Sequence, residues 1–148
     1  MSRPVDEEPP AWTIRPHAGV GPITLGATRT EIEAALGRRS VPVDKGGVEP
    51  TAVFGDVIVH AHFDESGRCE AVELMPPAQV TLGGQPLLAD SFASVERWLR
   101  RQDPELIVET DGVTSELLGV GLYAPLAREF PGRPPEGVIV FVRGYSGH

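Results

Sequence analysis

The sequence has a single cysteine and no long apolar run, and each of these shortages excludes a class of protein. Cys69 is the only cysteine in 148 residues, so neither an intrachain disulfide nor a thiolate metal cluster can form. No run approaches the ~18 apolar residues that a membrane-spanning helix needs. The amino-terminal stretch contains no apolar signal segment. We therefore expect a cytoplasmic protein without a membrane anchor.

Basic residues are also scarce. The chain has 13 Lys and Arg against 21 Asp and Glu, which gives a formal net charge of −8. The pairs Arg38–Arg39 and Arg100–Arg101 fall at the ends of predicted helices, where cations suit the helix dipole, and they form no basic stripe. A phosphate backbone would be repelled, so we expect no nucleic-acid partner. An acidic surface instead suits a basic protein partner.

Glycine and proline, in contrast, are abundant. The chain has 17 Gly and 15 Pro, against a combined share of roughly 12% in average proteins. The apolar content of 41% is close to that of globular proteins, so the excess indicates many turns between short elements. We expect a single domain over residues 12–148, preceded by a flexible, acidic, Pro-rich tail over residues 1–11.

A first helix is predicted between a capping box and a glycine stop. Thr28 and Glu31 have the capping-box spacing, in which the Thr28 hydroxyl accepts from the Glu31 amide and the Glu31 carboxylate reaches back. Gly37 suits the left-handed residue that ends a helix. The apolar residues between them share one helical face: Ile32, Ala35 and Leu36.

A second helix is predicted to begin at Asp90 or Ser91 and to end before Pro104. Its apolar residues recur at helical spacing: Phe92, Val95, Trp98 and Leu99. This spacing indicates that one side of the helix packs against a core.

Alternating apolar residues predict a hairpin of residues 57–64 and 69–75 around a turn in which Gly67 takes a positive φ. Residues 40–50 are predicted as a loop. Further strands are predicted over residues 106–108, 115–118, 120–123 and 138–142. Helices alternating with groups of antiparallel strands indicate an α+β fold, with the helices packed on one face of an antiparallel sheet.

Two similar stretches suggest that this arrangement occurs twice. "PITLG" leads to the first helix and "QVTLGG" leads to the second, and strands follow each helix. We therefore consider two degenerate αβββ-type half-repeats over residues 19–76 and 77–148.

The stretch "GPITLGATRTEIEAALG" also resembles the start of SmpA/OmlA-like domains. These small bacterial domains occur in an outer-membrane assembly lipoprotein, in the beta-lactamase inhibitor protein and in suspected immunity proteins. Ala27 replaces the methionine that is usual in them. The matching residues are Gly26, Thr28, Glu31, Ile32, Leu36 and Gly37. The resemblance implies a protein-binding module and carries over no catalytic residue.

One group of residues could bind a metal ion. Alternation places His60, His62 and Asp64 on the same strand face, where two imidazoles and a carboxylate could bind Zn²⁺. The plainer interpretation is the polar face of a half-buried strand. In the next strand, Glu70 or Glu73 could lie across from His62, either as an acid–base pair or as an ordinary cross-strand pair.

A second group could bind a partner. Glu105, Glu109, Asp111 and Glu116 could form an acidic patch that attracts a basic protein. The plainer interpretation is that these residues lie on solvated strand edges and turns. Trp12 lies in a Pro-rich lead-in, and we expect it to be exposed and available as an interface anchor.

These features favour a non-enzymatic protein-binding module, of immunity or inhibitor type, that covers the surface of a partner. One alternative is a small metal-dependent or acid–base enzyme that uses His60, His62 and Asp64. Another is a homo-oligomeric scaffold, such as a homodimer. We expect no bound cofactor other than zinc in the first alternative.

Overall fold

The computed structural model describes residues 12–44, 50–55 and 58–145. The predicted tail over residues 1–11 lies outside the described residues. Within the described part, the chain forms thirteen strands in two sheets and two helices. None of the described helices has the length and apolar character needed to span a membrane.

The larger sheet has eight strands, and all neighbouring strands in it are antiparallel. Their order across the sheet is β10-β11-β12-β13-β7-β6-β5-β4. The strands are β4 (Val41–Val43), β5 (Thr51–Phe54), β6 (Val59–Phe63), β7 (Cys69–Leu74), β10 (Ile107–Glu109), β11 (Gly112–Ser115), β12 (Val120–Tyr123) and β13 (Gly137–Phe141). The sheet is therefore two four-stranded meanders joined where β7 pairs with β13.

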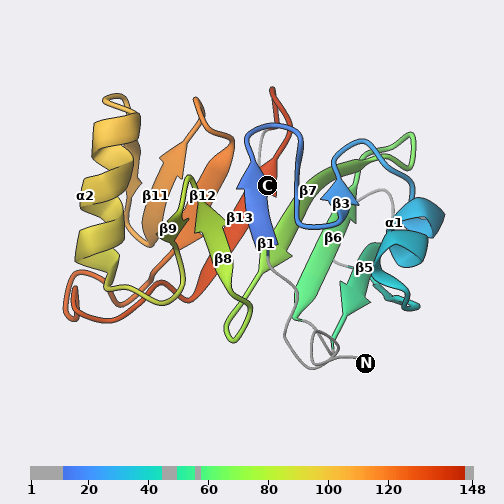
Figure 1. Ribbon diagram of the computed structural model, residues 1–148, viewed down its shortest axis with the longest axis horizontal. Coiled ribbons are helices and arrows are strands. Elements are labelled where there is room, and N and C mark those ends of the chain that lie inside the picture. Colours follow the sequence, from blue (N-terminus) through green and yellow to red (C-terminus); the bar gives the residue numbers. More distant parts are fainter. Residues whose placement is uncertain (1–11, 45–49, 56–57, 146–148) are drawn as a thin grey trace, which may run out of the picture.

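The smaller sheet has five short strands in the order β3-β2-β1-β8-β9. Its centre is a parallel pairing of β1 with β8, in which Trp12 lies opposite Val80. The strands are β1 (Trp12–Arg15), β2 (Gly19–Val20), β3 (Ile23–Thr24), β8 (Val80–Leu82) and β9 (Gln85–Pro86). Figure 1 shows this sheet over the middle of the larger one, with the two helices at its opposite ends.

The core lies between the two sheets. Buried apolar side chains from both sheets and from the helices form one continuous cluster. On β6, Val59, Ala61 and Phe63 point into this core, whereas His60 and His62 are half-buried on the opposite face. The predicted alternation along this strand is confirmed.

The predicted α+β class is wrong, because the chain is mostly β. The helices α1 (Arg29–Leu36) and α2 (Phe92–Gln102) contain 8 and 11 residues. They flank a second sheet that covers the middle of the larger sheet (Figure 1). Strands of two to four residues are too short to show a clear two-residue period, and this is why the smaller sheet was not predicted.

Both helices begin as predicted. In α1, the Thr28 hydroxyl accepts from the Glu31 amide, Glu31 accepts from the Thr28 amide, and Gly37 ends the helix at φ 67°. In α2, Ser91 rather than Asp90 is the cap, and Phe92, Val95 and Leu99 are buried. The hairpin of β6 and β7 is confirmed as well, with Gly67 at φ 80°.

Most predicted strands that are found differ by one or two residues at their ends, and two regions differ by more. Residues 41–43, expected in a loop, form edge strand β4. The strand expected over residues 115–118 is instead Gly112–Ser115, and the chain turns over residues 116–119. That turn closes on Gly119, at φ 68°, where a Cβ would lie 2.8 Å from the Phe141 carbonyl oxygen. Only glycine fits there without rearrangement, so the strand cannot continue through the turn.

Candidate functional site

The face of the eight-stranded sheet that points away from the core is the candidate site, and we call it the outer face. Neither helix and no strand of the smaller sheet lies on it (Figure 1). Strand register aligns one residue from every strand in a row across this face. From one edge to the other, this outer row is Val41, Val53, His60, Glu73, Ile139, Gly121, Thr114 and Ile107.

The outer row is apolar at its ends and polar near its centre. Val41 is 61% exposed and Ile107 is 42% exposed, although both are large apolar residues. His60 and Glu73 are half-buried between them. With strands ~4.8 Å apart, a row of eight strands extends about 34 Å, which is wide enough for a protein partner.

A short hydrogen-bonded chain crosses the outer face beside this row. The His62 Nδ1 lies 3.1 Å from the Thr51 Oγ1, and the His62 Nε2 lies 2.6 Å from the Glu73 Oε1. Thr51, His62 and Glu73 thus provide a hydroxyl, a base and a carboxylate that orients the base, which is the arrangement of an activated nucleophile. The Thr51 residue is only 4% exposed, however, so its hydroxyl has little access to a substrate. The arrangement therefore holds the Glu73 carboxylate in place and is unsuited to nucleophilic catalysis.

A β-bulge places a second carboxylate, that of Glu70, near the hydrogen bonds of His62. The register shifts between His62 and Phe63, which leaves Glu70 as an extra residue of β7. Burial first, and then the nearby Asp64 carboxylate, raise the pKa of Glu70. Burial also raises the pKa of Tyr145, with smaller contributions from the Glu70 and Glu73 carboxylates. Glu70 and Glu73 are the two half-buried residues of β7, whereas simple alternation without a bulge predicts opposite faces for them.

The predicted metal site is not assembled. The Asp64 Oδ1 accepts hydrogen bonds from the Ser66 amide and hydroxyl and from the Arg68 amide, so this carboxylate holds the hairpin turn. His62 contacts Thr51 and Glu73 instead. Within the described ranges, no three His, Cys, Asp or Glu side chains are grouped as metal ligands.

A cavity of about 540 Å³ opens on the outer face over β7 and β10–β13. Four carboxylates line it, together with His60 and Tyr123, and none of the described lining residues is Lys or Arg. The carboxylates are those of Glu73, Glu109, Asp111 and Glu136. They come from β7, from β10, from the turn after β10 and from the loop before β13.

Only part of the predicted acidic patch lies at this cavity. Glu109 and Asp111 line it, whereas the Glu105 amide donates to Asp103 at the end of α2. Glu116 lines a different cavity of about 340 Å³ near His17 and Tyr145. Sequence reasoning missed Glu136, which no local pattern distinguishes from other loop glutamates. Glu73 was one of the two glutamates that the sequence placed across from His62, and the structure shows that it is the one within hydrogen-bond distance.

The expectation for Trp12 is wrong. Its side chain is 2% exposed and belongs to the core, because β1 pairs with β8 at the centre of the smaller sheet. The prediction assumed that a Pro-rich lead-in continues as a loop. A partner on the surface cannot use this indole as an anchor.

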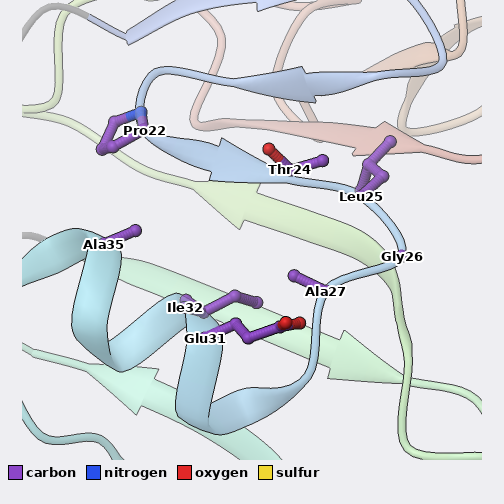
Figure 2. A pocket seen from close by; sticks show the side chains of 8 residues that line it. All are labelled: Pro22, Thr24, Leu25, Gly26, Ala27, Glu31, Ile32 and Ala35. Atoms are coloured by element: carbon purple, nitrogen blue, oxygen red, sulfur yellow. The ribbon is translucent and has the colours of Figure 1, made fainter.

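Another cavity, of about 410 Å³, lies between β3 and α1 (Figure 2). Figure 2 shows that Ile32 and Ala35 come from the helix and that Pro22 and Thr24 come from the strand side. Glu31 is the one charged residue among the described residues that line it, and its carboxylate is used in the capping box. The stretch over residues 21–37, which resembles SmpA/OmlA-like domains, therefore has a structural role.

Cys69 is also structural. The side chain is 1% exposed, and burial raises the pKa of its thiol to about 12. A thiol with this pKa is not a nucleophile near neutral pH.

No protein-family model, curated protein or solved structure matches this chain. The resemblance to SmpA/OmlA-like domains stays a prediction. The role of the outer face therefore has to follow from its geometry and charge.

Proposed function

We propose that the chain is a non-enzymatic protein-binding module that binds a basic partner on its outer face. The observation that carries this proposal is the charge of the cavity: among the residues that the structure describes, four carboxylates and no basic side chain line it. The narrower form of the proposal is an immunity or inhibitor protein, which acts by covering a functional surface of its partner.

The exposed apolar residues of the outer face support binding of a protein rather than of an ion alone. Val41 and Ile107 end the outer row, and Tyr123 is 51% exposed beside it. Exposed apolar and aromatic side chains around acidic groups are typical of an interface, in which apolar contacts provide burial and charges provide specificity. A face about 34 Å wide can supply the ~800 Å² per partner of a standard interface.

Charge explains why the partner should be basic. The net charge of −8 attracts cations over the whole molecule, and the cavity adds a local concentration of carboxylates. Such complementarity accelerates association and excludes acidic competitors. Binding should accordingly weaken as the salt concentration rises.

The experiment is capture of partners from the native cell on the immobilised full-length chain, followed by comparison of three baits. The first is the wild type, the second is Glu136→Lys, and the third is the control Glu65→Lys. Glu65 is exposed in the β6–β7 turn, and Glu65→Lys changes the net charge by the same amount as Glu136→Lys. We expect a basic protein to be bound by the wild type and by Glu65→Lys and to be lost with Glu136→Lys. Equal capture by all three baits would contradict the proposal.

The immunity or inhibitor role and the alternative of a homo-oligomeric scaffold are tested separately. For an immunity or inhibitor role, the captured protein should be a toxin or an enzyme whose activity the chain inhibits at equimolar concentration. A homo-oligomeric scaffold would instead elute from gel filtration as a dimer or larger species without any added protein, and would capture only itself.

A further inference from the structure

We propose that the cavity beside Tyr123 receives an arginine side chain of the partner. This inference rests on the proposed function and specifies which chemical group the outer face recognises. Space, an aromatic surface and carboxylates in the same cavity support it.

Two glycines of the outer face, Gly121 and Gly137, line this space. Gly121 lies between Thr114 on β11 and Ile139 on β13, and the Ile139 Cγ2 is already 3.0 Å from the place that a Cβ of residue 121 would take, so a larger residue there would crowd the cavity. Tyr123 is likewise paired with Gly112 on one side and Gly137 on the other. Glycine inside a strand weakens a sheet and often marks close approach of a ligand. The resulting cavity of about 540 Å³ is within the range of small-ligand sites.

The walls of the cavity suit the shape of an arginine side chain. Tyr123 is 51% exposed and offers its ring as a surface for a planar cation. Met75 and Ile139 provide apolar surface for the methylene groups of the stem. Lysine would gain less from an aromatic surface, because its ammonium group is compact and more strongly hydrated than a guanidinium.

The carboxylates supply the hydrogen-bond acceptors. Glu109 is held by the Thr114 hydroxyl at 3.0 Å, and Glu73 is held by His62. The Asp111 and Glu136 carboxylates have no hydrogen bond or ion pair with another described residue, so both can accept from a ligand. A guanidinium group has five N–H donors and binds carboxylates in pairs of parallel hydrogen bonds. Carboxylates that line one cavity from several elements can supply acceptors for this fork of donors.

The test is an NMR titration of the full chain with N-acetyl-arginine amide. N-acetyl-citrulline amide is the matched control, because it has nearly the same shape and no charge. We expect the backbone amide signals of Gly121, Tyr123 and Gly137 to move with arginine, and the citrulline compound to bind at least about tenfold more weakly. Equal effects of the two compounds, or shifts confined to other parts of the chain, would overturn the inference.

Two variants assign the binding to the cavity. Tyr123→Ala removes the exposed ring, and Glu136→Gln removes one charge without changing the shape of the side chain. Each should weaken arginine binding several-fold, whereas the control Glu65→Gln should not. Unchanged binding in both cavity variants would place arginine elsewhere and contradict the inference. Because both substitutions are at exposed positions, the fold should tolerate them.

The inference and the proposed function can fail separately. If N-acetyl-arginine amide does not bind while Glu136→Lys still loses a captured partner, the outer face binds a protein but not through arginine. If arginine binds in the cavity while all baits capture the same proteins equally, the arginine site is correct and the proposed protein-binding role is wrong.

Discussion

At the scale of single residues, His62 shows how a polar side chain is built into the sheet. It lies between the Thr51 hydroxyl and the Glu73 carboxylate, and both ring nitrogens are therefore within hydrogen-bond distance of a partner. Sequence alternation predicted that His62 points away from the core and that a glutamate of the next strand could approach it. Thr51 was not predicted, because β5 itself was not recognised.

The Thr51→Val substitution tests the importance of this hydrogen-bonded chain. It keeps a branched side chain in a buried position and leaves the His62 Nδ1 without its partner. We expect the free energy of unfolding to fall by about 1 kcal/mol, measured by urea denaturation. Thr13→Val, at an exposed position of β1, is the matched control and should change stability by less than about 0.5 kcal/mol. Equal effects of the two substitutions would contradict this role for Thr51.

The raised pKa of the buried Cys69 thiol should make the stability of the chain depend on pH. Burial raises the pKa of the thiol from 9.0 to about 12 in the folded chain, so the unfolded chain releases its proton first as the pH rises. The stabilising contribution is complete below pH 9 and is lost between about pH 9 and 12.

Comparison with Cys69→Ala isolates this effect, because other groups titrate equally in both proteins. From pH 8 to pH 10, the wild type should lose about 1 kcal/mol more of its free energy of unfolding than the variant. Urea denaturation at the two pH values provides the measurement. An identical loss in both proteins would mean that the thiol ionises normally in the folded state.

At the scale of elements, the helices and strands that were predicted correctly are those whose defining residues all lie within one short stretch of the sequence. The capping box of α1, the cap and apolar side of α2, and the β6–β7 hairpin each depend on neighbours within about ten residues. The smaller sheet depends on partners far apart in the chain, such as Trp12 and Val80. Its strands are also too short for a clear period. For the same reason, the cavity could be predicted only in part: its carboxylates come from residues 73 to 136 and meet only in the folded sheet.

The Thr28→Ala substitution tests the α1 capping box. It removes the hydroxyl that accepts from the Glu31 amide, and we expect a loss of about 1 kcal/mol in unfolding free energy. Thr30→Ala, at an exposed position inside α1, is the control and should be neutral or slightly stabilising. A loss of equal size in the control would show that the cap makes no specific contribution.

The charged half of the capping box should respond to pH. The Thr28 amide lowers the pKa of Glu31, so its contribution is present above the ordinary glutamate value of 4.5 and is lost as the pH falls below it. The Glu31→Gln variant should therefore lose less stability than the wild type when urea denaturation is repeated at pH 3 and pH 7. A greater loss in the variant would contradict this assignment.

At the scale of the whole molecule, the two halves of the chain have parallel designs. The strands β4–β7 follow α1, the strands β10–β13 follow α2, and the two meanders meet at β7 and β13. Before each helix, a hairpin turns on a glycine of nearly equal φ, 55° at Gly21 and 56° at Gly83. The division into half-repeats stays a prediction. It differs in detail from the arrangement found here, because four strands rather than three follow each helix.

This arrangement also explains why the outer face is available for binding. All of the described secondary structure outside the eight-stranded sheet lies on its core side, so the two meanders present one wide face with apolar edges and an acidic cavity (Figure 1). The central claim is that a basic partner covers this face.

Amide hydrogen–deuterium exchange of the full chain, with and without its captured partner, tests that claim most directly. We expect the complex to slow exchange in β6, β7, β12 and β13 and in the loop that contains Glu136, with little change in α1, α2 and the smaller sheet. Protection confined to the helices or to the β8–β9 hairpin would place the partner on the opposite side and contradict the claim.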